Sequence, residues 1–235
     1  MDEATCNAIG RRESRRASRR EAIVKVAARH FLDHGYSATS MSAIAAALGG
    51  SKGTLWSYFP SKEELFTAVI DHVSTMFRAE LTEILDPCGD LKLTLKTLCL
   101  RFQQKVTAPN AIALHRLVVA EASRFPEIGR IFYERAPRLT TMLLADFLSG
   151  AMARGQLRQD DPVFAAQVLI SLSYVRVQQQ LLMGLAHEIT PAQQEDEAER
   201  ALRLFLRAYG TEGEAAKAAL KDEAPSAAPP ITPLS

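Results

Sequence analysis

Apolar residues recur at intervals of three and four along almost the whole chain, which is the spacing of amphipathic helices. Ile23, Ala27 and Phe31 show this pattern near the N-terminus. Sustained alternation of apolar and polar residues is nearly absent, and the Asn-Gly and Asp-Gly dipeptides of tight hairpins do not occur. The pattern therefore predicts an all-α protein with about nine helices.

Three helices separated by turn residues are predicted near the N-terminus. An S-x-x-E capping box beginning at Ser18 opens the first helix, and Gly35 ends it. The second begins after Ser40 and stops at Gly49-Gly50, and the third covers residues 52–58. Two short helices joined by a tight turn, with another helix before them, are typical of a helix-turn-helix DNA-binding domain.

The rest of the chain predicts a larger helical bundle. A second capping box, beginning at Ser61, opens a long helix that runs to about Leu85. Further helices are predicted over residues 91–106, 110–122, 127–154, 162–184 and 191–210. Pro137 should kink or split the third of these. The predicted regions are a basic, poorly ordered arm (1–17), a helix-turn-helix DNA-binding domain (18–62), a ligand-binding and dimerisation domain (63–210) and a disordered tail (211–235).

The formal charge of the chain is +1, but it is unevenly distributed. Residues 1–62 hold ten Lys and Arg against five Asp and Glu, whereas residues 63–235 hold 18 against 22. A basic part followed by an acidic part indicates two regions with different functions. Six arginines between residues 11 and 20 are either a solvated run or an arm that contacts DNA, and the sequence leaves both readings open.

The cysteine and histidine content argues against metal or disulfide chemistry. Cys6, Cys88 and Cys99 show no C-x-x-C spacing, which fits a reducing cytosol, and the five histidines are scattered. No signal peptide is recognised, and no apolar run approaches the roughly 20 residues of a membrane span. We expect a cytoplasmic protein with no cofactor, metal or membrane partner. A redox role for Cys88 or Cys99 stays open.

The predicted third helix has a small polar face opposite an apolar one. At about 100° per residue, Leu55 and Phe59 share the side that faces the core. The opposite side carries Gly53, Thr54 and Ser57, and the flanks carry Lys52, Trp56 and Tyr58. Small side chains allow close approach to base edges in the major groove. The flanking residues suit contacts to phosphates, and Lys52 also suits a contact to guanine.

Residues 35–66 resemble the DNA-binding domain of the TetR family of bacterial transcriptional repressors. The resemblance is carried above all by Ser-Lys-Gly-Thr-Leu-Trp-Ser-Tyr-Phe at positions 51–59, followed by Lys62. The C-terminal part resembles the AefR/AcrR-type subgroup of the family. That similarity lies in Ala-Glu-Ala-Ser-Arg-Phe-Pro-Glu at positions 120–127 and Phe-Tyr-Glu at positions 132–134.

The resemblance implies a homodimeric repressor that binds a (pseudo)palindromic operator in double-stranded DNA, frequently near efflux genes. The positions that match the family's base-reading residues are Ser42, Gly53, Thr54, Ser57 and Tyr58, and those that match its phosphate-contacting residues are Ser40, Trp56 and Lys62. Two departures leave the operator sequence open. Ser42 stands where many members carry Arg, and Gly50 replaces the usual branched aliphatic residue of the turn.

The bundle beyond residue 90 is expected to bind a small, mostly apolar effector. The residues predicted to bind it are Phe102, His115, Val118, Leu143, Phe147, Tyr174 and Arg176. The helices predicted over 162–184 and 191–210 each show two apolar stripes, so one stripe can form a four-helix seam with a second copy. An effector that prefers one arrangement of this dimer would release the DNA. Activation, or repression that depends on a bound co-repressor, stays open.

Two other functions match parts of the sequence. Residues 49–53 fit G-x-S-x-G, the nucleophile elbow of serine hydrolases, with Ser51 as the nucleophile. That elbow follows a strand, whereas residues 43–48 favour helix, so we expect no enzyme and no catalytic residue. The other alternative is a helical adaptor that binds no DNA. It would lack the steep salt dependence that phosphate contacts impose on DNA affinity.

Overall fold

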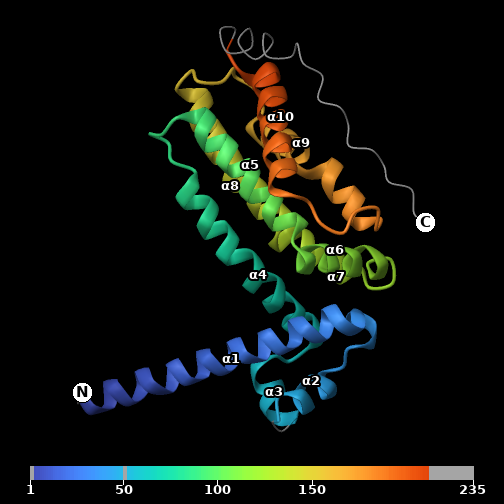
Figure 1. Cartoon of the computed structure of the whole chain (residues 1–235). Coiled ribbons are helices and arrows are strands. Elements are labelled where there is room, and N and C mark those ends of the chain that lie inside the picture. Colours follow the sequence, from blue (N-terminus) through green and yellow to red (C-terminus); the bar gives the residue numbers. More distant parts are fainter. Residues whose placement is uncertain (1–2, 50–51, 212–235) are drawn as a thin grey trace. The chain divides into compact units, whose positions relative to one another are not determined.

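The chain is helical almost throughout, which confirms the predicted fold class. The computed structural model describes residues 3–49 and 52–211, with side chains from residue 13 onward except that of Lys52. The helices of this part are α1 (Glu3–Ala38), α2 (Met41–Ala47), α3 (Lys52–Tyr58), α4 (Lys62–Ile84), α5 (Leu91–Thr107), α6 (Pro109–Glu121), α7 (Pro126–Arg135), α8 (Pro137–Ala153), α9 (Pro162–Leu182) and α10 (Pro191–Tyr209) (Figure 1). A single bridge between Leu157 and Gly210 is the β pairing found in the described residues.

The split predicted at Pro137 separates α7 from α8. The amide of Ala136 still donates to the carbonyl oxygen of Phe132 at 3.0 Å, so α7 completes its last turn. Proline has no N–H to donate, and its ring clashes with the preceding helical turn. The chain therefore starts a new helix at Pro137.

Helix α1 begins at Glu3 and not at Ser18 as predicted. The segment expected to be a poorly ordered arm is thus helical from Glu3 onward. The capping box is absent because Ser18 lies inside the helix, where its hydroxyl donates to the carbonyl oxygen of Ser14 at 3.0 Å. No proline and a single glycine occur in the first 34 residues, so nothing in the sequence stops the helix from continuing through Ser18.

Two other boundaries of the N-terminal region lie where they were predicted. Gly35 interrupts α1 with a φ of +83°, a conformation that favours glycine. Ser40 caps α2, since its Oγ accepts a hydrogen bond from the amide of Ala43 at 3.1 Å. The turn residues Gly50-Ser51 and the predicted tail from residue 212 lie outside the described residues.

The helices form two compact units. Unit 1 comprises the chain up to Met76 together with Ala113–Ala136, and unit 2 comprises Phe77–Ile112 and the chain from Pro137. Helices α4 and α6 each contribute residues to both units. Unit 1 therefore contains the predicted helix-turn-helix region and also the first part of α4, most of α6 and α7.

An aromatic cluster lies at the centre of unit 1. The rings of Phe31, Tyr36 and Phe66 contact one another with centroid separations of 5.3 to 5.6 Å. Other members of this core are Ile23, Ile44, Leu55, Phe59, Leu65, Leu117, Val118 and Ile128. Buried aromatic and aliphatic groups thus join α1–α4 to the later segment of α6 and α7.

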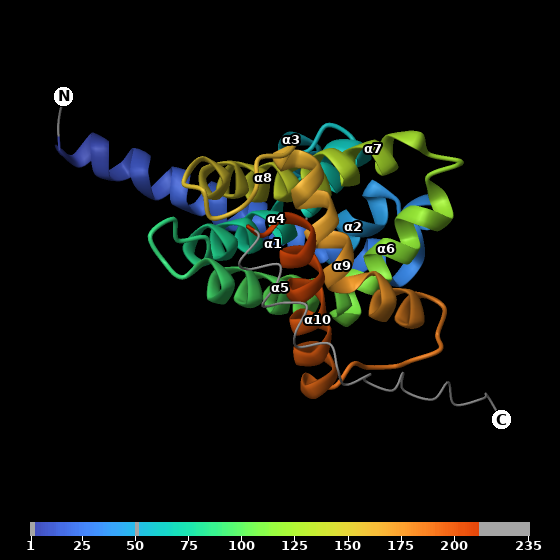
Figure 2. The ribbon, with the colours of Figure 1, turned by 90° about the horizontal axis from the view of Figure 1, so that it is seen from above.

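Unit 2 is a bundle of α5, α8, α9 and α10. Helix α9 packs against the other three, and α10 also packs against α5 (Figure 2). Its core includes Leu95, Leu98, Leu148, Leu169 and Phe205. None of the helices in the described ranges is both long enough and apolar enough to cross a bilayer.

Candidate DNA-binding surface

Helix α3 exposes the small polar face that the sequence predicts. Leu55 and Phe59 are buried in the core of unit 1. The residues exposed on α3 are Gly53, Thr54, Trp56 and Ser57. The hydroxyl of Ser57 donates to the carbonyl oxygen of Thr54 at 2.8 Å, so its oxygen still has acceptor capacity for a base or phosphate donor. Lys52 begins the helix, but its predicted DNA contact lies outside the described side chains.

Helix α2 carries the other two serines of the predicted DNA contacts. Ser40 is exposed, and because its Oγ acts as an acceptor in the cap, its hydroxyl proton remains available to a phosphate oxygen. Ser42 is partly exposed in the first turn of α2. Their roles toward DNA stay predictions.

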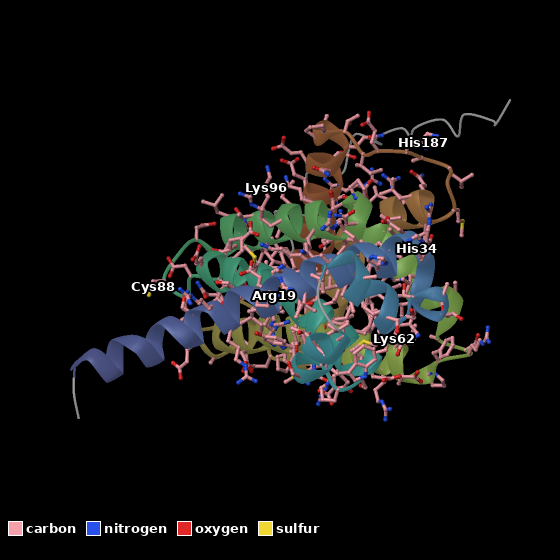
Figure 3. All side chains as sticks on the ribbon, turned by 90° about the horizontal axis from the view of Figure 1, so that it is seen from below. Arg19, His34, Lys62, Cys88, Lys96 and His187 are labelled. Atoms are coloured by element: carbon pink, nitrogen blue, oxygen red, sulfur yellow. The ribbon has the colours of Figure 1, made fainter. Side chains whose placement is uncertain are left out.

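Lys62, predicted to contact phosphate, binds the backbone of its own unit. Its Nζ donates to the carbonyl oxygens of Tyr36 at 2.9 Å and Thr39 at 3.2 Å, and it lies 4.2 Å from the centroid of the Tyr36 ring. An ammonium group has three N–H donors, so these bonds leave one for a phosphate. The geometry thus gives Lys62 a structural role at the α1–α2 junction and is compatible with the predicted DNA contact (Figure 3).

Glu121, at the end of α6, binds the same α1–α2 junction, but its negative carboxylate binds backbone N–H groups where Lys62 binds carbonyl oxygens. Its Oε1 accepts from the amide of Tyr36 at 2.8 Å and its Oε2 from the amide of Ser37 at 2.7 Å. These partners are 84 and 85 residues away along the chain. No local motif signals a contact over that separation, so sequence reasoning had no means to assign Glu121 to this unit.

Tyr36 connects the junction to the start of α4. Its ring is buried, and its hydroxyl donates to Oε1 of Glu63 at 3.2 Å. Burial, and then the neighbouring Glu63 carboxylate, raise the pKa of Tyr36 well above its ordinary value. The phenol therefore remains a donor throughout the physiological pH range.

Two arginines of α1 lie against the C-terminal end of α3. The guanidinium carbon of Arg16 is 5.8 Å from the centroid of the Tyr58 ring, and that of Arg20 is 5.0 Å from the centroid of Phe59. Both distances are within the range of cation–π contacts. The early turns of α1 thus bring positive charge next to Tyr58, one of the predicted DNA-contacting residues.

Most of the predicted effector-binding residues lie in unit 2. The Phe102 ring contacts those of Phe77 and Tyr174, with centroid separations of 5.9 and 5.5 Å. Phe147 is buried and Leu143 is packed against the same core. Arg176 forms an ion pair with Glu197, a buried residue of α10, which neutralises its charge.

His115 and Val118 belong to unit 1. Val118 is part of the core of that unit, and the rings of His115 and Phe132 lie nearly perpendicular to each other with a centroid separation of 6.1 Å. Burial lowers the pKa of His115, so its neutral form is favoured. The effector site as a whole stays a prediction.

The geometry of the described residues does not favour the serine-hydrolase, cysteine or metal chemistry considered from the sequence. The residues before Ser51 form helix α2, whereas a nucleophile elbow follows a strand. Cys99 is buried, accepts from the hydroxyl of Ser173 at 3.2 Å, and has a pKa raised to about 11 by burial, so its thiol is a poor nucleophile. Cys88 is exposed. Within the described residues, no group of three or more His, Cys, Asp or Glu side chains is arranged to hold a metal ion.

Comparison with known protein families assigns both parts of the chain to transcriptional regulators. Residues 23–69 match the sequence profile described as bacterial regulatory proteins of the tetR family. Residues 93–211 match the profile described as the C-terminal domain of AefR-like transcriptional repressors. The second match alone covers half of the chain.

Individual relatives are regulators of the same kind. The chain is 31% identical over 127 residues to the HTH-type transcriptional regulator BetI of Rhizobium meliloti, an alignment that spans 54% of this chain and 63% of BetI. Among solved structures, a TetR-family transcriptional regulator from Mesorhizobium loti has a TM-score of 0.74 at 26% identity, covering 83% of this chain and 98% of its own. The flavonoid-responsive regulator FrrA has a TM-score of 0.70 at 34% identity, covering 83% and 99%.

Proposed function

Because the chain belongs to the TetR family of bacterial transcriptional regulators, we propose that it is a repressor that binds an operator as a homodimer and leaves it when a small effector binds. The observation that carries this proposal is the exposed polar face of α3, held on a buried apolar face. The operator is a (pseudo)palindrome in double-stranded DNA, since a two-fold symmetric dimer presents two identical reading helices.

Base reading is assigned to the small polar residues of α3 and to one serine of α2. The groups proposed to reach base edges are Ser42, Gly53, Thr54, Ser57 and Tyr58. Ser40, Lys52, Trp56 and Lys62 are proposed to bind phosphates. None of these proposed base-reading residues is an arginine, so the proposed set contains no bidentate arginine–guanine contact.

The dimer is proposed to form through α9 and α10. Phe164 and Val175 of α9 are 56% and 46% exposed and lie eleven residues apart, which places them about 20° apart around the helix. Val168 lies close to the same line, and Leu204 of α10 is also exposed. An apolar stripe of this kind fits a four-helix seam between two copies.

The proposed effector is a mostly apolar, aromatic molecule that carries a hydroxyl group. Phe77, Phe102 and Tyr174 supply aromatic surface in unit 2. Beside them, Gln103 is fully buried; its Nε2 donates to the carbonyl oxygen of Ser173 at 2.7 Å, and its Oε1 has no partner among the described residues. A phenolic hydroxyl would satisfy that oxygen, and the similar protein FrrA is described as a flavonoid-responsive regulator.

Release follows from a difference in affinity between two states of the dimer. If the effector prefers an arrangement whose recognition helices do not match the half-site spacing, its binding lowers operator affinity. Coupling of this kind is typically about 1–3 kcal/mol, which is roughly a fivefold to 150-fold loss of DNA affinity. The position of the operator would identify the target genes, and efflux genes are candidates.

Footprinting of the purified full-length protein on the DNA that flanks its own gene tests the proposal. We expect a protected, two-fold symmetric site whose affinity falls steeply with salt, and a loss of protection when a flavonoid that stabilises the protein in a thermal-shift assay is added. If the protein binds the operator more tightly in the presence of that compound, the compound is a co-repressor and the proposed release is wrong. The absence of any protected site would contradict DNA-binding repression.

A further inference from the structure

Helix α1 extends well beyond the core of unit 1. Among the described side chains of the helix, the first core residue is Ile23, and the helix begins at Glu3. The twenty residues before Ile23 therefore add about five and a half turns, or roughly 30 Å at 1.5 Å per residue. In Figure 1 this part of α1 continues past α2 and α3 toward the N-terminus.

The extension is strongly basic. Residues 11–20 read Arg-Arg-Glu-Ser-Arg-Arg-Ala-Ser-Arg-Arg, which is six arginines and one acidic residue. All side chains described from Glu13 to Arg20 are exposed, and no salt bridge joins the four arginines among them to another described residue. Exposed like charges that lack a counter-charge repel one another, and this repulsion is relieved when a polyanion binds.

Three of the described arginines form a stripe on one side of the helix. At about 100° per residue, a sector of about 100° contains Arg15, Arg16 and Arg19, which we call the arginine stripe. Arg16 marks where this side of α1 faces, because its guanidinium lies over the ring of Tyr58 at the end of α3. Arg19 of the stripe is shown on α1 in Figure 3.

We propose that the arginine stripe binds the phosphate backbone of duplex DNA outside the half-site that α3 reads. This inference rests on the proposed DNA-binding function, because Tyr58 is one of the residues assigned to the operator. The regular helix holds the guanidinium groups three and four residues apart, and each can bind phosphate with paired N–H donors. The stripe adds affinity and salt dependence without reading sequence.

The test compares two double variants that each remove two exposed charges. Arg15→Gln/Arg19→Gln alters the stripe and leaves the contacts of Arg16 and Arg20 with α3 in place. Arg130→Gln/Arg154→Gln is the matched control, with one exposed arginine from α7 and one that follows α8. Affinity is measured across a salt series on the operator with long flanks and on a duplex trimmed to the two half-sites that α3 reads, without the flanking base pairs. Thermal melting checks that both variants are folded.

On the long duplex, we expect the stripe variant to bind about tenfold more weakly at low salt, with a log–log salt slope shallower by about 2. On the trimmed duplex, the affinity of the stripe variant should lie within twofold of that of the unmodified protein. The affinity of the control variant should lie within twofold on both duplexes. Equal binding of the stripe variant and the unmodified protein on the long duplex overturns the proposal, and so does an equal loss on both duplexes. If the unmodified protein binds neither duplex specifically, the proposed function itself fails.

Discussion

The backbone between α1 and α2 is held by two oppositely charged side chains. Glu121 accepts from the amides of Tyr36 and Ser37, and Lys62 donates to the carbonyl oxygens of Tyr36 and Thr39. Gly35 lies at the same place, and a Cβ there would be 2.6 Å from Oε1 of Glu121. The positive φ favours glycine at residue 35, and a Cβ there would also force the Glu121 carboxylate to move away from the two amides that it binds.

Glu121→Gln should destabilise the protein and weaken operator binding. The amide keeps one acceptor oxygen but replaces the other by an NH₂ group, so one backbone N–H loses its partner. Hydrogen bonds to charged groups contribute about 1.5–3 kcal/mol, so we expect the free energy of unfolding to fall by about 1–3 kcal/mol. Urea unfolding measures this change. Glu83→Gln, at an exposed site of α4, is the control, and an equally small effect of both variants would contradict a role for Glu121.

His115 should make stability fall in mild acid. Burial lowers its pKa in the folded state below the ordinary value of 6.5, so on acidification the unfolded chain takes up the proton first. The free energy of unfolding therefore decreases as the pH falls from 7 through 6.5 toward the folded-state pKa. Unfolding measured at several pH values should show a weaker decrease in His115→Phe than in the unmodified protein. Exposed His187→Asn is the control, and identical profiles for all three proteins would exclude His115 as the cause.

At the scale of elements, α3 depends on its buried side for its position. The helix has seven residues, which is too short to be stable alone in water. Leu55 and Phe59 hold it in the core of unit 1, and this leaves the small polar face exposed. The exposed residues can therefore be changed with little effect on the fold.

Thr54→Ala and Tyr58→Phe should each lower operator affinity while the thermal midpoint stays close to that of the unmodified protein. Tyr58→Phe removes only the hydroxyl, so the ring that Arg16 contacts remains. Loss of a base contact typically costs about 1–3 kcal/mol, or roughly a fivefold to 150-fold loss of affinity. Titration of a labelled operator against an unrelated duplex separates specific from general binding. Unchanged specific affinity in both variants would show that α3 reads DNA with other residues.

At the scale of the whole molecule, the proposed operator recognition depends on two copies of the chain. A single seven-residue helix contacts few bases, so specificity requires two half-sites read at a defined separation. The exposed apolar stripe on α9 is the surface proposed to set that separation. The proposed recognition helix α3 and the proposed seam lie in different units, so a change at the seam should affect DNA binding without altering the α3 surface.

Phe164→Glu/Val175→Glu should convert the dimer into a monomer and reduce operator affinity by at least tenfold. A carboxylate at these positions would face its symmetry mate in an apolar seam, which is costly to desolvate. Sedimentation velocity measures the assembly, and the operator titration measures the consequence. Val119→Glu, at an exposed apolar position of α6, is the control. A double variant that still sediments as a dimer would exclude this seam.

The sequence by itself determined the helical fold, the ends of most helices and the exposed face of α3. These features depend on spacing within one or two turns: the periodicity of apolar residues, the cap at Ser40, the glycine at residue 35 and the break at Pro137. The start of α1 was misplaced because Ser18 and Glu21 form a capping signal that has meaning only where the preceding residues are not helical.

Only the tertiary structure decided which distant groups meet. Glu121 contacts the amides of Tyr36 and Ser37, and Lys62 donates to two carbonyl oxygens of the α1–α2 junction. Helix α7 belongs to unit 1. Each of these features joins segments that are far apart in the chain. Local propensity carries no information about such pairs. They arise when buried apolar surfaces bring helices together and the polar groups left between them must find partners.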